Sequence, residues 1–166
     1  MDTAGLKKFA QSARSQLMEQ VRSKLDLVLD PASAARREHP KAMGELDAAI
    51  ARESKAQVIE QVSYTWFNRF TALRFMDVNS YTSTGIVSPA EGQTRPEILS
   101  EAMAGNLPDG APANITSLLD GRTPSSDPQA EAYRLLLVHA CNQWHDQMPF
   151  LFEKLDDYTE LLMPED

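Results

Sequence analysis

The sequence lacks most of the features that mark exported and membrane proteins. Its single cysteine, Cys141, excludes an internal disulfide and fits a reducing compartment. No apolar run approaches the roughly 20 residues of a membrane span, and the N-terminus carries no apolar signal-peptide core. We therefore expect a cytoplasmic protein that makes no contact with a membrane.

Recognisable catalytic and metal-binding motifs are also missing. The chain has no Pro-Pro pair, no Gly-x-Gly turn and no Gly-x-Ser-x-Gly elbow. On a helix His139 and His145 would lie about 240° apart, so they cannot share a metal ion. Cys141 lies among apolar residues and is expected to be buried and inert. We therefore assign no catalytic, cofactor-binding or metal-binding residue.

Positive charge is scarce in the second half of the chain. The net charge is +3 over residues 1–41, −1 over 42–80 and −10 over 81–166, which gives −8 in total. Because DNA affinity rests on Lys and Arg that neutralise phosphates, we expect weak DNA binding by this chain alone. The basic side of the first predicted helix supplies the candidate contacts Lys7, Lys8 and Arg14. The alternative is that they form a solvated surface.

Aromatic residues, by contrast, are concentrated in one stretch. Five of the twelve residues from Tyr64 to Phe75 are aromatic, with no Gly or Pro between them. Helical spacing puts apolar side chains on one side (Val62, Trp66, Phe70, Leu73) and on roughly the opposite side (Tyr64, Phe67, Phe75, Val78). Since a helix that is apolar on nearly all sides is normally buried, we predict a central helix covered by its neighbours.

Three polar residues on this predicted helix have two interpretations. Asn68, Arg69 and Arg74 lie within the apolar run. They can form a buried network with carboxylates such as Asp77, Glu60 or Asp146. Alternatively, they can reach outward to an adjoining domain or to DNA.

Periodicity and breaker residues predict an all-α, bundle-like single domain over residues 1–166, with about five to seven helices. In the first half of the chain we predict a first helix that ends at Asp30-Pro31, a short helix in 33–38, and then over 43–79 either one helix or two in line with a kink near Ser63. In the second half we predict a helix at 96–103 and a short helix at 115–119 that Asn114 caps and Gly121 closes. The last long helix begins at Pro128 and is broken by Pro149.

Apolar residues also accumulate near the C-terminus. These are Phe150, Phe152, Leu161, Leu162 and Met163. Burying one such side chain is worth about 1.5–3 kcal/mol, so several of them on a terminus should find a partner. We expect a partly exposed apolar patch around 149–163 that contacts another domain or promotes self-association.

Four stretches of the chain resemble one known family. YTWFNRFTALRFMDVN resembles a signature near the N-terminus of the BREX-type, PglX-like adenine-specific DNA methyltransferases of bacterial phage defence, and related restriction–modification methyltransferases carry similar sequences. LKKFAQSARSQLMEQVRSKL, VSPAEGQTRPEIL and YRLLLVHACNQWHDQMPFLFEKLDDYTELLMPED resemble the family's first helix, a following loop and the segment that leads into the methyltransferase domain. The resemblance covers most of the chain.

The resemblance implies an N-terminal helical domain whose catalytic domain is expected beyond the end of this chain. The intact protein would transfer a methyl group from S-adenosylmethionine to adenine N6 in a specific DNA site. Such an enzyme needs an Asx-Pro-Pro-aromatic loop and a Gly-rich turn, which this chain lacks, so the chain alone should be inactive and hold no cofactor. The implied partners are its own catalytic domain, DNA and other BREX proteins. The alternative is a stand-alone helical module for protein–protein interaction.

Overall fold

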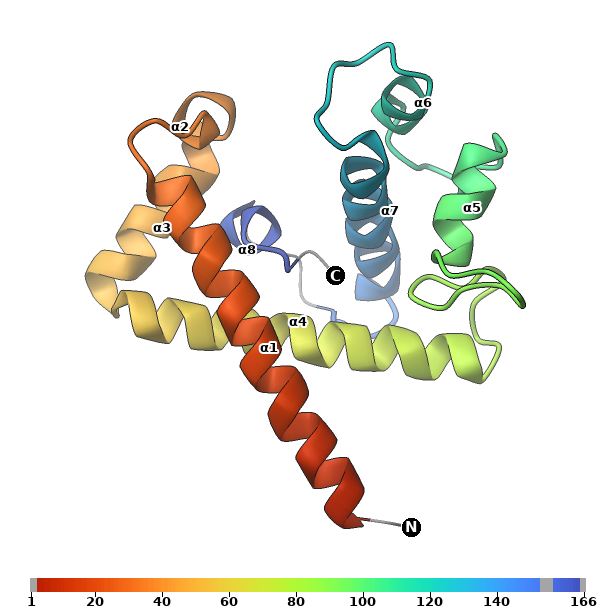
Figure 1. The fold of residues 1–166 in the computed structure, drawn as a ribbon, viewed down its shortest axis with the longest axis horizontal. Helices are drawn as coiled ribbons and strands as arrows, with labels where there is room; N and C mark the ends of the chain where they lie inside the picture. Colours follow the sequence, from red (N-terminus) through yellow and green to blue (C-terminus); the bar gives the residue numbers. More distant parts are fainter. Residues whose placement is uncertain (1–2, 153–156, 165–166) are drawn as a thin grey trace. The chain divides into compact units, whose positions relative to one another are not determined.

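A computed structural model describes residues 3–152 and 157–164, which form α-helices joined by loops (Figure 1). The helices are α1 (Thr3–Leu29), α2 (Ala35–Glu38), α3 (Pro40–Arg52), α4 (Lys55–Val78), α5 (Glu97–Met103), α6 (Asn114–Leu119), α7 (Pro128–His145) and α8 (Asp157–Leu161). Within these two ranges there is no β-strand, and one isolated bridge joins Pro89 and Pro96. The predicted all-α fold is confirmed.

The helices group into two compact units that share α4. The first unit contains residues 1–68 and 155–166, and the second contains residues 69–154. Helix α4 is continuous across the boundary, so residues 55–68 belong to the first unit and residues 69–78 to the second. The single domain expected from the sequence stays a prediction.

The core of the first unit includes the fully buried side chain of Trp66. Its indole N–H donates a hydrogen bond to the carbonyl of Thr159 at 3.0 Å, which ties α4 to α8 across 93 positions of sequence. Helix α8 also packs against α3. Other buried side chains of this unit include Val21, Leu25, Met43, Leu46, Val58, Val62, Leu162 and Met163. The C-terminal residues therefore complete the core of the N-terminal helices.

An ion pair joins the two short helices of this unit. Arg36 of α2 donates through both terminal nitrogens to the carboxylate of Asp47 in α3, at 2.7 and 3.2 Å. These hydrogen bonds hold the pKa of Asp47 below its usual range. Both side chains are about half exposed, so solvent screens the pair and it contributes little to stability.

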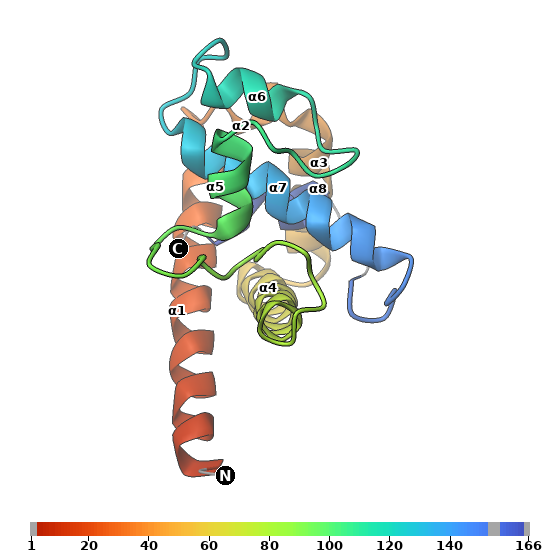
Figure 2. The same cartoon turned by 90° about the vertical axis from the view of Figure 1, so that its right-hand side faces the viewer.

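Helix α1 is covered by its own unit only in its C-terminal half. Its buried residues are Val21, Leu25 and Val28, whereas Leu6 is 58% exposed and Phe9 is 67% exposed. Figures 1 and 2 both show the N-terminal half extending away from α2, α3 and α8. The helix ends where the sequence predicted, with the Asp30 carboxylate accepting a hydrogen bond from the Ala32 N–H at 2.7 Å.

The helix predicted over 43–79 breaks ten residues before the expected kink. Helix α3 ends at Arg52, and the Ser54 hydroxyl accepts a hydrogen bond from the Gln57 N–H at 3.2 Å to begin α4. Ser-Lys-Ala-Gln has the spacing of a capping box, a local signal that was present in the sequence. The kink near Ser63 was wrong, because its hydroxyl donates to the Ile59 carbonyl at 2.6 Å within an unbroken helix.

The second unit packs α5, α6 and α7 against one another. As predicted, Asp127 caps α7, accepting a hydrogen bond from the Ala130 N–H at 3.0 Å with Pro128 in the first turn. Gly121 closes α6 at φ +72°, also as predicted. The predicted cap at Asn114 was wrong, because Asn114 is the first helical residue and no side chain caps α6.

None of the helices in the described part of the chain is both long enough and apolar enough to cross a lipid bilayer.

Replacing Trp66 with Phe tests the tie between α4 and α8. An aromatic ring is kept, but the smaller phenyl fills less of the core and the buried Thr159 carbonyl loses its donor, so the free energy of unfolding should fall by at least about 1–3 kcal/mol. Urea denaturation followed by circular dichroism measures this change. Trp144→Phe, at a half-buried tryptophan, is the matched control and should cost less. A loss for Trp66→Phe within about 0.5 kcal/mol of zero would show that the hydrogen bond is dispensable.

Candidate functional site

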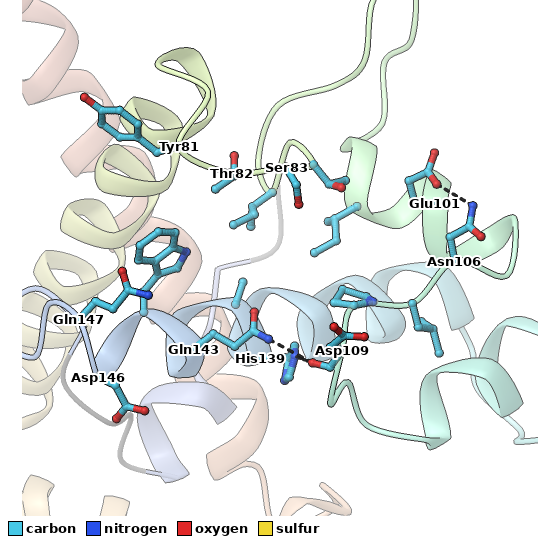
Figure 3. A pocket seen from close by; sticks show the side chains of 17 residues that line it. Tyr81, Thr82, Ser83, Glu101, Asn106, Asp109, His139, Gln143, Asp146 and Gln147 are labelled. Atoms are coloured by element: carbon cyan, nitrogen blue, oxygen red, sulfur yellow. Dashed lines mark hydrogen bonds between the residues drawn. The ribbon is translucent and has the colours of Figure 1, made fainter.

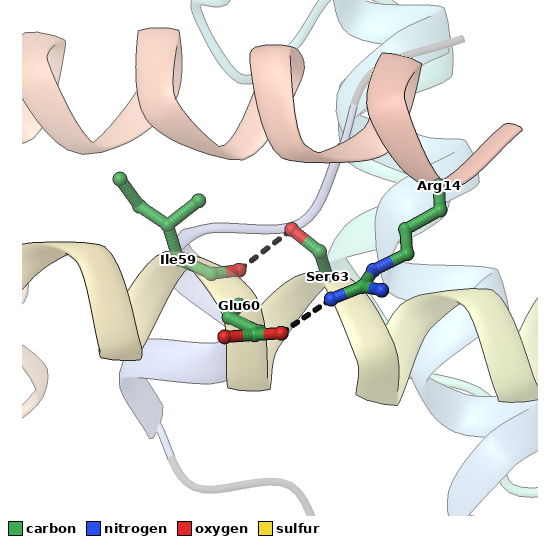
Figure 4. A network of polar contacts seen from close by, with 4 residues as sticks. All are labelled: Arg14, Ile59, Glu60 and Ser63. Atoms are coloured by element: carbon green, nitrogen blue, oxygen red, sulfur yellow. Dashed lines mark hydrogen bonds and ion pairs between the residues drawn. The ribbon is translucent and has the colours of Figure 1, made fainter. Parts of the chain in front are cut away.

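The basic residues predicted on α1 differ in their surroundings. Lys7 and Lys8 are exposed. Arg14 is also exposed and forms an ion pair with Glu60 of α4 (Figure 4). We expected Glu60 to pair with an arginine of α4, but it pairs with Arg14 of α1. Lys7 and Lys8 remain the candidate contacts to an acidic or phosphate-bearing surface.

The polar candidates on α4 do not form one exposed surface. Asn68 is half-buried, Arg69 is only 3% exposed and Arg74 is exposed. Burial favours a structural role for Arg69 over contact with another molecule. The guanidinium of Arg74 donates to the Ser88 hydroxyl, so Arg74 helps to hold the loop that follows α4.

The prediction that α4 is covered on nearly all sides was wrong. Trp66 and Leu73 are fully buried, but Tyr64 is 66% exposed, Phe75 60% and Val78 64%. The neighbouring helices cover one side of α4 and leave these apolar side chains in solvent. Beyond the helix, the rings of Phe75 and Tyr81 meet edge to face, with centroids 6.1 Å apart. Phe75, Val78 and Tyr81 form an exposed apolar cluster, called the α4 end cluster below.

The predicted exposed patch near the C-terminus was also largely wrong. Phe150 is 82% exposed, but Phe152, Leu161, Leu162 and Met163 are buried. In the second unit, the ring of His145 contacts the Phe152 carbonyl through Nδ1 at 2.7 Å, which turns the chain back toward α7. The other three residues lie in the core of the first unit. Most of the apolar side chains that we expected to contact a partner are therefore buried within the chain itself.

Asp77, which the sequence offered as a partner for arginine, organises the loop after α4. Its carboxylate accepts hydrogen bonds from the backbone N–H groups of Ile86, Val87 and Ser88 at 3.0, 2.9 and 3.0 Å. It also accepts from the hydroxyls of Thr82 and Ser88 at 2.9 and 2.8 Å. Five donors converge on one carboxylate, so its charge is satisfied by the loop rather than by an arginine.

Three further hydrogen bonds fix this loop against α5 and α7. Gly85 donates its N–H to the Glu97 carboxylate at 2.6 Å, and its carbonyl accepts from the Ile98 N–H at 3.0 Å. A Cβ at position 85 would lie 2.6 Å from the Ser88 carbonyl oxygen, so only glycine fits. The Tyr133 hydroxyl of α7 donates to the Ile86 carbonyl at 3.2 Å. Burial, with the Asp77 charge second, raises the pKa of this phenol, so it stays protonated and able to donate.

The loop forms one wall of a groove of about 780 Å³ in the second unit. Figure 3 shows Thr82 and Ser83 on one side and Gln143 of α7 on the other. Apolar side chains contribute to the lining, and these are Ile86, Ile98, Leu107, Pro108, Ala140 and Trp144. The sequence did not predict the groove, because its walls come from separate segments that only the fold brings together. We name it the α7 groove.

The α7 groove is acidic. Glu101, Asp109 and Asp146 are among its lining residues, and none of the lining residues is Lys or Arg. Figure 3 shows Glu101 at one end and Asp146 at the other. The loop that carries Asp109 is held to α7, because the side chains of His139 and Gln143 contact the Asp109 carbonyl at 3.1 Å each. Such a site suits a ligand with positive charge rather than a phosphate.

Cys141, His139 and His145 do not form a catalytic or metal-binding cluster with other described residues. Cys141 is buried, as predicted. The ring of His139 contacts the Asp109 carbonyl, and the ring of His145 contacts the Phe152 carbonyl. Among the residues with described positions, no three His, Cys, Asp or Glu side chains gather as a metal site would require.

The chain was compared with known proteins. No protein-family model matches it. It is 32% identical over 193 aligned positions to the adenine-specific methyltransferase BrxX of Escherichia coli O9:H4 (strain HS), covering 99% of this chain and 16% of that protein. It is 38% identical over 117 positions to the adenine-specific methyltransferase PglX of Lacticaseibacillus casei (strain Zhang), covering 66% of this chain and 10% of that protein. The chain thus spans a small part of either relative, and the resemblance seen in its sequence is confirmed.

Replacing Asp77 with Asn tests the organisation of the loop. An amide in place of one carboxylate oxygen would point N–H groups at donors, and hydrogen bonds to a charged acceptor are worth about 1.5–3 kcal/mol each. We expect the free energy of unfolding to fall by at least about 2 kcal/mol. Hydrogen exchange at Ile86, Val87 and Ser88 should also accelerate.

The matched control for this substitution is Asp120→Asn, at an exposed residue paired with Arg122. It should leave both measurements almost unchanged. Equal protection of the loop amides in wild type and Asp77→Asn would contradict the role assigned to Asp77.

Proposed function

We propose that this chain, which belongs to the family of BREX-type adenine-specific methyltransferases, is the N-terminal helical part of such an enzyme. The intact enzyme would methylate adenine N6 in a specific DNA site as part of a phage-defence system. The observation that carries the proposal is the 32% identity to BrxX, which extends over 99% of the chain. A match over nearly the whole chain, rather than over one helix, supports a shared fold and a shared position in a longer protein.

The chemistry belongs to other parts of that longer protein. The sequence has neither a Gly-x-Gly turn for the methyl donor nor a Pro-Pro pair for the adenine amino group. In this proposal S-adenosylmethionine is the cofactor of the intact enzyme, and this chain supplies a structural or recognition role.

Packing against the catalytic domain is the role that the exposed surface supports best. The α4 end cluster holds three large apolar side chains in solvent, and Phe150 is 82% exposed. Exposed apolar surface of this kind marks a contact with another protein surface. We assign the α4 end cluster and Phe150 to the contact with the catalytic domain.

DNA contact is a secondary role in this proposal. The exposed cations Lys7, Lys8 and Arg74 could neutralise phosphates, but the net charge of −8 opposes the approach of the chain to DNA. Strong DNA binding in the intact enzyme would then come from its other domains. Other BREX proteins are further candidate partners.

Exchanging the N-terminal region of BrxX tests the proposal. In the E. coli strain named above, freed of its other adenine methyltransferases, deletion of the BrxX region that aligns with this chain should abolish N6-methyladenine in host DNA, measured by mass spectrometry of nucleosides. Inserting this chain in its place should restore part of the methylation, because the two share 32% identity. An unrelated helical domain of equal length is the control. Restoration no better than the control would overturn the proposal.

The reading frame of the gene separates the proposal from its alternative. A frame that continues past Asp166 into an Asx-Pro-Pro-aromatic loop and a Gly-rich turn supports a methyltransferase. A stop codon directly after Asp166 would instead favour the stand-alone interaction module.

A further inference from the structure

The N-terminal half of α1 combines an uncovered apolar stripe with positive charge. None of residues 3–20 is buried, and Leu6 and Phe9 are mostly exposed. Residues 3–18 contain Lys7, Lys8 and Arg14 and no acidic residue. This half of α1 is therefore suited to bind a surface that is apolar in part and acidic.

The α7 groove has the complementary character. Its lining includes Ile86, Ile98 and Ala140, together with the carboxylates of Asp109 and Asp146. No lysine or arginine lines it. Its volume of about 780 Å³ lies within the range of about 300–1,000 Å³ that is usual for binding pockets.

We propose that the α7 groove binds the N-terminal end of α1, residues 3–13, from a second copy of this chain. Leu6 and Phe9 lie three residues apart and share one side of the helix. At 100° per residue, Lys7 and Lys8 lie about 130° to either side of the middle of that stripe. The two apolar side chains enter the groove, and the long lysine side chains extend to carboxylates at its rim.

The charges on the chain favour this occupant over others. Nucleic acid is excluded from the groove because phosphates would face carboxylates with no cation between them. Direct pairing of two α1 helices is disfavoured because residues 3–18 hold no acidic residue, so Lys7 and Lys8 of one copy would meet no carboxylate on that segment of the other. The groove and α1 supply opposite charges from one sequence, so a second copy provides both halves of the contact.

The proposed contact should make the molar mass depend on concentration and salt. Light scattering or sedimentation measures the mass across a dilution series of the full chain. At about 0.1 M salt, where charges interact over about 10 Å, the mass should rise with concentration. At about 1 M salt, where that distance falls to about 3 Å, the association should weaken by about tenfold or more. A chain that stays monomeric throughout at the lower salt overturns the proposal.

A charge exchange identifies the surfaces. Lys7→Glu with Lys8→Glu gives one variant, and Asp109→Lys with Asp146→Lys gives a second. Each variant alone should lose association, because charges of one sign then face each other. A mixture of equal amounts should associate again, since basic α1 of the second variant meets the acidic groove of the first. Association of either variant alone at wild-type strength would contradict the assignment.

Matched controls separate local contact from total charge. Arg22→Glu with Lys55→Glu makes the same change in net charge at two other exposed cations and should keep association. Phe9→Ala removes the largest apolar side chain of the stripe and should weaken association without changing charge. If the Arg22 and Lys55 control also loses association, net charge is responsible and the proposed contact is wrong. Failure of the chimeric BrxX to methylate DNA would leave these measurements unaffected, because they depend on this chain alone.

Discussion

The conformation of the loop after α4 in the second unit depends on the hydrogen bonds that the Asp77 carboxylate accepts. A loop of this length, with turn-forming residues and no strand partners, has many backbone N–H groups to satisfy. Asp77 accepts three of them, from Ile86 to Ser88, and two hydroxyls as well. The loop conformation then places Thr82 in the wall of the α7 groove. A single charge at the end of α4 thus determines both the loop and the shape of a candidate binding site.

Several apolar side chains of the two units remain uncovered in the described part of the chain. Helix α1 leaves Leu6 and Phe9 in solvent, and α4 leaves Phe75 and Val78 in solvent. The C-terminal residues Leu162 and Met163, by contrast, are buried in the core of their own unit. The chain corresponds to 16% of the length of BrxX, and surfaces of this kind are expected where one part of a long protein meets another.

The sequence by itself determined the all-α fold class and most helix ends, because these follow from local chemistry. Asp30-Pro31 ended α1, and Asp127-Pro128 opened α7, as expected from residues that act within one turn of where they stand. The capping box at Ser54 carried the same kind of information, although the longer apolar pattern obscured it. The likeness to the methyltransferases was likewise a property of the sequence, since it rests on residues in order rather than on their packing.

The tertiary structure alone decided which apolar sides are covered and which polar groups meet. Helical periodicity showed that Tyr64 and Trp66 were both apolar positions, but burial depends on whether another helix lies against that side, and only Trp66 has one. The donors that satisfy Asp77 and the carboxylates of the α7 groove come from segments separated along the chain. A pattern in sequence specifies a face of one element, whereas a site requires faces of several elements to be brought together by the fold.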